Sequence, residues 1–428
     1  MQKISIKNDL VSGSVKYPLL FLICILFLFY VYSFFHPIPT PSLISNTVGL
    51  GSAYLDIGDR SFYFHDNSSS YGYGEDGNIR GSFLYPFILN FLAYIISKLG
   101  FGTTAWNIAV IFLASLCAVA SLLFLDKSAN IIFDKRIATI ASWFFVLCPY
   151  TIFYCLSGGI TIYVTLGISF STYIILKSNI FNSSKNASKI SLTMILLLFN
   201  VLFLSSIRVT GSVFSIILVF SIAIITYKKS INQIIKLSRI DKIIIYSIVT
   251  FCLVYCFYQI KLNTNYLSLT LNNFVSEGGT LFGLERQFIR EKIQSIAVED
   301  LNYIKSYFYL ILWKIIDLVS GLSDIRDTHT NDVIYFFPFF SRIFVGLFII
   351  YPMNLLAFFG IFIYWKKIYY SGFWIILVAA LVCLAPNLLG VAFARYLIMV
   401  YPPFIIISAK VFGLLLNELN YQMRKEIS

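Results

Sequence analysis

The sequence predicts an all-α fold: a polytopic transmembrane helical bundle of about ten spans, with interfacial helices in two outer loops. Three observations predict it. Hydrophobic residues make up 58% of the 428 residues, and charged residues make up 12%, about half of the ~25% found in soluble domains. Apolar runs of helical length recur from one end of the chain to the other. Most basic residues lie in short clusters between these runs, as on the cytoplasmic face of a membrane protein.

Eleven apolar runs carry this prediction. A helix that crosses the bilayer core takes about 20 predominantly apolar residues, and most of the runs approach or reach that length. We interpret residues 17–35 as a retained helix rather than a removed signal peptide, because no small-residue cleavage site follows them. The runs are residues 17–35, 83–99, 104–125, 138–154, 158–176, 190–207, 211–227, 243–260, 342–364, 373–392 and 396–416.

The basic residues indicate which run does not span. Three lysines near the start of the chain place the N-terminus in the cytoplasm. If every run spanned, the loop that carries Lys127, Lys135 and Arg136 would lie outside, against the positive-inside rule. We therefore expect residues 83–99, which are short and contain Pro86, to lie in the outer interface as an amphipathic or re-entrant helix. Both termini are then cytoplasmic, and most acidic residues lie outside.

Two predicted outer segments, residues 36–103 and 261–341, are much longer than ordinary connecting loops. Within the second, residues 303–320 are apolar with interspersed charges, the pattern of another interfacial helix. The predicted cytoplasmic loops are short, so we expect the chemistry on the outer face. The chain divides into an N-terminal transmembrane module with a catalytic first outer loop (1–260), a large outer loop (261–341) and C-terminal transmembrane helices (342–428).

Two carboxylates lie shortly after the first predicted span. Asp56 and Asp59 both belong to the first outer loop, near the expected membrane boundary. A low-dielectric environment disfavours the charged form of a carboxylate, and such a group can serve as a general base. Asp59 and Asp56 are therefore the catalytic candidates, and the alternative is that they are solvated loop acids.

Four arginines are candidates for phosphate binding. Arg208 and Arg395 each lie between two apolar runs at the predicted outer boundary, where a charge is costly unless it snorkels or has an anionic partner. Guanidinium groups match phosphate in bidentate fashion, so we interpret this pair as ligands of a phosphate or pyrophosphate. Arg286 and Arg290 lie four residues apart in the second outer segment, where a solvated helix face is the alternative. For Arg208 and Arg395 the alternative is snorkelling to lipid phosphate.

Metal and nucleic-acid chemistry find little support in the sequence. His36, His65 and His329 are single, scattered residues, and the seven cysteines form no CxxC motif, so we expect no metal site. The net charge of +12 comes from clusters that membrane topology requires, so we expect no nucleic-acid partner.

Four segments, taken in order, carry a resemblance to a known family. GDRSFYF (58–64) contains Asp59, IRGSFLYPFILNFLAYIISKLG (79–100) follows it, residues 104–176 form the next predicted spans, and FARYLIMVYPPFIII (393–407) comes near the end. This order resembles the GT-C superfamily of membrane glycosyltransferases. The segments are similar to that family's acidic segment, its juxtamembrane helix, its following spans and a common ending with Arg-Tyr and a proline-bearing helix.

The resemblance implies a membrane glycosyltransferase of the O-antigen-modifying type in a bacterial inner membrane. Its donor is a polyprenyl-phosphate-linked sugar, and its acceptor is a surface polysaccharide or lipid-linked glycan. Asp59, or failing it Asp56, deprotonates the acceptor hydroxyl, and Arg208 and Arg395 stabilise the departing phosphate with inversion at the sugar. No cofactor is implied. The predicted second outer loop (153–164) departs from the family because it holds no acidic residue, which leaves a divalent metal and a second carboxylate open.

Two other functions fit parts of the pattern. An O-antigen polymerase has a similar span number and a large late outer loop, here with Arg286 and Arg290. A lipid-linked oligosaccharide flippase belongs to a different class. It is disfavoured because transporters carry polar or charged groups in the middle of their helices, whereas the predicted spans of this chain are nearly free of charge.

Overall fold

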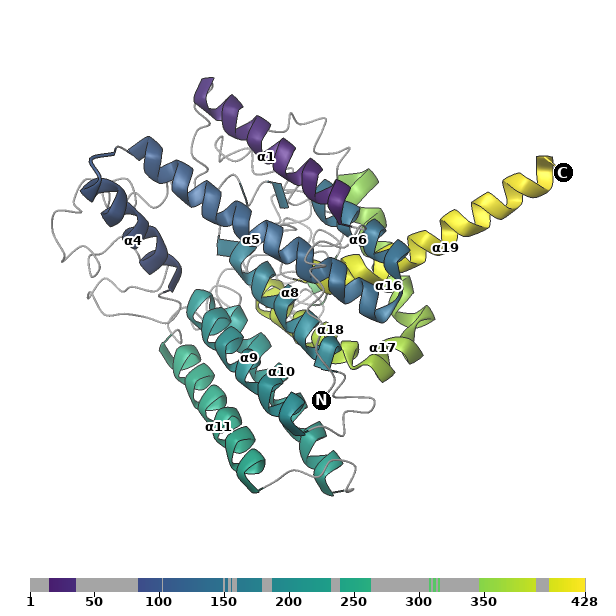
Figure 1. The fold of residues 1–428 in the computed structure, drawn as a ribbon. Helices are drawn as coiled ribbons and strands as arrows, with labels where there is room; N and C mark the ends of the chain where they lie inside the picture. Colours follow the sequence, from purple (N-terminus) through teal and green to yellow (C-terminus); the bar gives the residue numbers. More distant parts are fainter. Residues whose placement is uncertain are drawn as a thin grey trace, which may run out of the picture.

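The computed structural model describes residues 15–35, 84–101, 103–148, 151–152, 155, 160–178, 187–231, 239–262, 308, 311–312, 315, 346–389 and 400–427. The regular structure in these ranges is helical throughout (Figure 1). The helices are α1 (Lys16–Phe35), α4 (Leu84–Lys98), α5 (Thr103–Ile132), α6 (Lys135–Leu147), α8 (Ile160–Ser178), α9 (Ala187–Ile207), α10 (Val209–Ile231), α11 (Arg239–Leu262), a π-helical turn (Gly346–Ile350), α16 (Tyr351–Ile363), α17 (Trp365–Ser371), α18 (Phe373–Leu389) and α19 (Tyr401–Ile427).

The described helices are those of a helical membrane protein. Four of them are long and apolar enough to cross a bilayer: Ile108–Ile132, Thr210–Lys228, Lys242–Lys261 and Tyr401–Met423. A bent pair, Phe348–Ile363 and Trp365–Ser371, adds a fifth if it is counted as one span. Shorter apolar helices cover Lys16–Leu28, Phe87–Ile96, Leu192–Ile207 and Phe373–Cys383. The total of about ten spans stays a prediction.

Each predicted apolar run contains a described helix, but several helices continue beyond their runs. The predicted loop 126–137 is mostly helical, because α5 continues through Asp126 and Lys127 to Ile132. The Asp134 carboxylate then accepts a 3.0 Å hydrogen bond from the Ile137 amide and caps α6. Residues 365–371, expected to link two spans, form α17. Of the predicted interfacial helix 303–320, the structure describes residues 308, 311, 312 and 315, and they are helical.

The predicted interfacial run 83–99 forms α4, which folds back along α5 (Figure 1). Gly100, with a positive φ of 78°, lies in the turn between the two helices. Tyr85 at the start of α4 packs edge to face on Tyr163 of α8, with ring centroids 5.6 Å apart. One side of α4, including Leu89, is therefore buried against the bundle. Its orientation relative to a membrane remains a prediction.

Polar and small residues hold the helices of the bundle together. Asn200 of α9 donates hydrogen bonds to the Gly167 carbonyl at 2.9 Å and to the Ser171 hydroxyl at 2.5 Å, both on α8. In α19, the Ser408 hydroxyl donates to the Met353 carbonyl of α16 at 2.7 Å. Small side chains and interhelical hydrogen bonds are the usual means of association in membranes, where apolar contact alone gives little preference for protein over lipid.

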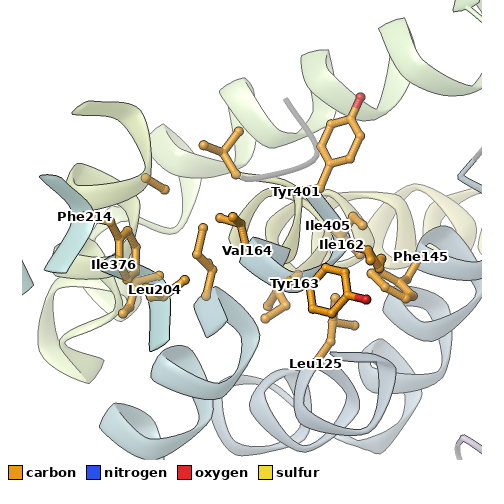
Figure 2. Close-up of a cluster of buried hydrophobic side chains, with 14 of the residues drawn as sticks. Leu125, Phe145, Ile162, Tyr163, Val164, Leu204, Phe214, Ile376, Tyr401 and Ile405 are labelled. Atoms are coloured by element: carbon orange, nitrogen blue, oxygen red, sulfur yellow. The ribbon is translucent and has the colours of Figure 1, made fainter. Parts of the chain in front are cut away.

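A buried apolar core connects helices that are distant in the sequence. Figure 2 shows side chains from α5, α6, α8, α9, α10, α18 and α19 converging in this core. The core places the start of α8 and the start of α19 close to the same region of the bundle. The labelled members are Leu125, Phe145, Ile162, Tyr163, Val164, Leu204, Phe214, Ile376, Tyr401 and Ile405.

Basic side chains gather where α5, α8 and α10 end and where α6 and α11 begin, which we call the basic end. Lys127 of α5 and Lys177 of α8 both lie over the Tyr173 ring, which shows that these helix ends meet. The opposite end, where α9 ends and α8, α10 and α19 begin, is the predicted outer end. Which side of the membrane the basic end faces stays a prediction. Its basic residues include Lys127, Lys135, Arg136, Lys177, Lys228, Arg239, Lys242, Lys366 and Lys367.

Candidate functional site

Among the predicted site residues, the structure describes Arg208. Asp56, Asp59, Arg286, Arg290 and Arg395 lie outside the described residues, so their positions and roles stay predictions. Arg208 lies at the predicted outer end, and the described residues around it form the candidate site.

Arg208 is the junction residue between two antiparallel helices. It follows the last residue of α9 and precedes the first residue of α10. Its amide donates to the Leu204 carbonyl at 3.1 Å, and its own carbonyl accepts from the Gly211 amide at 2.8 Å and the Ser212 amide at 3.3 Å. The backbone of Arg208 thus completes one helix and starts the next, which fixes the base of its half-buried side chain.

Gly211 allows this junction to be tight. A Cβ atom at residue 211 would lie 2.2 Å from the carbonyl oxygen of Leu204, which is part of the α9 backbone. No non-bonded atoms approach so closely, so any larger residue must push the two helices apart. The missing side chain of Gly211 therefore helps to set where Arg208 leaves the bundle.

A third helix, α18, packs on the same junction. The Cys383 thiol of α18 donates a hydrogen bond to the Thr210 carbonyl of α10 at 3.1 Å. The described part of α18 ends at Leu389, six residues before Arg395 in the sequence.

Two buried tyrosines, which the sequence interpretation missed, begin helices at the predicted outer end. Tyr163 lies near the start of α8 and Tyr401 opens α19 (Figure 2). The Tyr163 side chain is 2% exposed, and its hydroxyl has no hydrogen-bond partner among the described residues. Buried tyrosine hydroxyls usually find a partner, so this one is a potential donor to a bound polar group. An aromatic residue within an apolar run carries no sequence signal that separates it from ordinary core.

The described residues hold no group of three or more His, Cys, Asp or Glu side chains arranged to bind a metal ion. The polar groups that they bring to the predicted outer end include a guanidinium, a thiol, phenol hydroxyls, the Ser206 hydroxyl and the Gln259 amide. A half-buried arginine whose backbone is held at a helix junction can bind an anion at a membrane boundary.

No protein-family model matches the sequence, and no curated protein sequence matches it. A solved structure of the archaeal oligosaccharyltransferase AglB from Archaeoglobus fulgidus, in complex with an inhibitory peptide and a dolichol-phosphate, aligns with 91% of this chain at 13% identity and a TM-score of 0.46. The chain spans 48% of the length of that protein. A likeness at this level carries no argument about activity.

Proposed function

We propose that this chain is a membrane glycosyltransferase that moves a sugar from a polyprenyl-phosphate carrier to a surface polysaccharide, such as O-antigen, or to another lipid-linked glycan. The reaction takes place on the outer face of a bacterial inner membrane. The order of the sequence segments around Asp59, residues 79–100, residues 104–176 and residues 393–407 supports the class of enzyme. The observation that carries the proposal is the position of Arg208, half-buried at the α9–α10 junction.

The surroundings of Arg208 support the proposed phosphate-binding role. Three hydrogen bonds fix the backbone of Arg208, so its side chain leaves the helix junction from one defined position. The neighbouring helix α18 leads into the segment that carries Arg395. Two arginines that share one phosphate neutralise more of its charge and bind it in a defined orientation. Arg286 and Arg290, in the large outer loop, are further candidates for the same phosphate.

The proposed reaction is a single displacement. Asp59, or failing it Asp56, removes the proton of the acceptor hydroxyl, and the oxygen attacks the anomeric carbon of the donor sugar. The bond between that carbon and the phosphate oxygen breaks, its electron pair stays on the phosphate, and the configuration inverts. Arg208 and Arg395 stabilise the charge that develops on the leaving phosphate, the interaction that accelerates such transfers most.

The test compares Arg208→Gln and Arg208→Lys with Lys98→Gln in purified protein. Lys98 ends α4 and is an exposed cation, so its substitution makes the same charge change as Arg208→Gln. The assay measures transfer from radiolabelled polyprenyl-phosphate hexoses to the polysaccharide of the cells that express the protein. We expect Arg208→Gln to lower kcat/KM about 100-fold or more, Arg208→Lys to recover part of it, and Lys98→Gln to match wild type. Equal activity of all variants, with unchanged thermal stability, would exclude the proposed role of Arg208.

A further inference from the structure

A cluster of two lysines and two aromatic rings lies at the basic end, away from the proposed site. We call Phe133, Tyr364, Lys367 and Lys410 the lysine–aromatic cluster. The Lys367 ammonium lies 4.9 Å from the centroid of the Phe133 ring, and the Lys410 ammonium lies 5.5 Å from the centroids of both rings. The two rings contact each other edge to face, with centroids 5.7 Å apart. Residues from three parts of the chain thus converge at one point.

The positive charge of this cluster has no carboxylate partner among the described residues. Two ammonium groups that share one ring lie within about one Debye length, ~10 Å at 0.1 M ionic strength, and repel each other. Arg136 lies three residues after Phe133, and it donates a hydrogen bond to the neutral side-chain amide of Asn417. The Asp134 carboxylate, next to Phe133, caps α6 through the Ile137 amide and keeps its negative charge, but it forms no ion pair with Lys367 or Lys410. Aromatic faces attract cations but do not neutralise them, so the cluster favours an added anion.

Lys410 occupies an unusual position for a surface lysine. It lies nine residues into α19, inside the apolar segment Tyr401–Met423, and its side chain is half-buried. Its ammonium is directed to Phe133, in the turn between α5 and α6, and to Tyr364, at the break between α16 and α17. A long lysine side chain on such a segment extends its ammonium towards the headgroups, and a charge at that boundary is costly unless it has an anionic partner.

The neighbouring helix α17 has the character of an interfacial helix. It turns 79° away from the axis of α16, so it runs across the bundle end rather than along the spans. Trp365, Tyr369 and Tyr370 are exposed on it, while Ile368 is buried. Tryptophan and tyrosine concentrate at the headgroup level of a bilayer, because their rings combine an apolar body with a polar edge. α17 therefore indicates that the cluster lies at headgroup depth.

We propose that the lysine–aromatic cluster binds the phosphate of an anionic phospholipid headgroup in the leaflet at the basic end. Lys367 and Lys410 supply the donors for the phosphate oxygens. The exposed aromatic side chains of α17 offer an apolar surface for the first methylenes of the acyl chains. A soluble anion has no apolar part that could pack on this surface, so the arrangement favours a lipid as the ligand. The site does not depend on the proposed transferase activity, because it lies at the other end of the bundle.

The test measures lipid binding by the full-length protein with the double variant Lys367→Gln/Lys410→Gln. The control is Lys228→Gln/Lys242→Gln, which removes the same charge from exposed lysines at the basic end. Native mass spectrometry follows binding of phosphatidylglycerol and of phosphatidylcholine to protein in neutral detergent. Each lysine near an anionic surface adds a similar, favourable contribution to the binding free energy. The loss of two such contributions corresponds to a roughly 30-fold lower affinity for phosphatidylglycerol. We expect little change in the control and little dependence of phosphatidylcholine binding on either variant.

Three results would overturn the proposal. The first is an equal loss of phosphatidylglycerol affinity in the Lys367/Lys410 variant and in the Lys228/Lys242 control. The second is an equal affinity of the wild-type protein for phosphatidylglycerol and phosphatidylcholine. The third is full displacement of bound phosphatidylglycerol by millimolar inorganic phosphate. The last result would assign the site to a free anion. If the glutamine variant fails to fold, Lys367→Arg/Lys410→Arg keeps the charge, and it must retain phosphatidylglycerol within about threefold of wild type. A folded arginine variant that loses the lipid also contradicts the proposal.

Discussion

Leu204 of α9 contacts two glycines in different ways, which gives a matched pair of substitutions. A Cβ atom at Gly211 of α10 would lie 2.2 Å from the Leu204 carbonyl oxygen, a backbone atom. A Cβ atom at Gly167 of α8 would lie 2.3 Å from Leu204 Cδ2, the flexible end of a side chain. Gly211→Ala therefore requires a backbone shift at the α9–α10 junction, whereas Gly167→Ala requires Leu204 to change rotamer. We predict that the first substitution destabilises the protein more.

The magnitudes follow from two opposing terms. Replacing glycine by alanine within a helix stabilises it by about 1 kcal/mol. Overpacking costs about 1–3 kcal/mol, and the upper part of that range applies where the obstacle is backbone. Gly211→Ala is then destabilising by about 1–2 kcal/mol. For Gly167→Ala the two terms nearly cancel, because an off-rotamer side chain costs about 0.5–1.5 kcal/mol.

The assay is unfolding in detergent at matched lipid content, with Leu204→Ala added to each variant. Leu204→Ala alone costs about 2–5 kcal/mol because it leaves a cavity. Removing that side chain opens space for a methyl group at residue 167 but leaves the carbonyl oxygen opposite residue 211. The double-mutant cycle should show favourable coupling between Gly167→Ala and Leu204→Ala, and little coupling between Gly211→Ala and Leu204→Ala. Wild-type stability of Gly211→Ala, or its full rescue by Leu204→Ala, would refute the packing argument.

Three further substitutions test the interior of the bundle by the same unfolding measurement. Tyr163→Phe removes a buried hydroxyl that has no hydrogen-bond partner within the described part of the chain, so stability should stay equal or rise by about 1 kcal/mol, and a fall would contradict this. Asn200→Ala removes the bonds to Gly167 and Ser171 and should cost about 1–2 kcal/mol. Ser408→Ala loses one interhelical bond and should cost about 0.6 kcal/mol. Equal costs for these two would show that the number of bonds does not decide the loss.

Apolar runs predicted the positions of the helices but not their ends. Hydrophobicity shows which segments contact lipid or the protein core. Helix formation depends on backbone hydrogen bonds, which charged residues can also form. Asp126 and Lys127 therefore continue α5, and Asp126 is buried and accepts a 3.4 Å hydrogen bond from Ser142 of α6. The 79° turn before α17 also had no sequence signal, because a Trp/Lys/Tyr segment fits both a loop and an interfacial helix.

The candidate site divides in the same way. The boundary between two apolar runs was enough to identify Arg208 as a residue at a helix junction, and the structure confirms that position. The contact of Cys383 with Thr210 joins residues that are distant in the chain, and no local pattern contains that information. Tyr163 was missed because the sequence pattern around a tyrosine in an apolar run is the same whether or not its hydroxyl has a hydrogen-bond partner. The roles of Asp56, Asp59, Arg286, Arg290 and Arg395 remain predictions.

The most direct test of the proposed function is the structure of the surface polysaccharide in cells whose chromosomal copy carries Asp59→Asn, with Asp56→Asn made in parallel. Glycan analysis reports both the side-chain sugars and the polymer length. The proposal predicts that Asp59→Asn removes one side-chain sugar while the polymer length is unchanged. A collapse of the polymer to single repeat units would contradict it in favour of a polymerase, and wild-type glycan in both variants would contradict a catalytic role for either carboxylate.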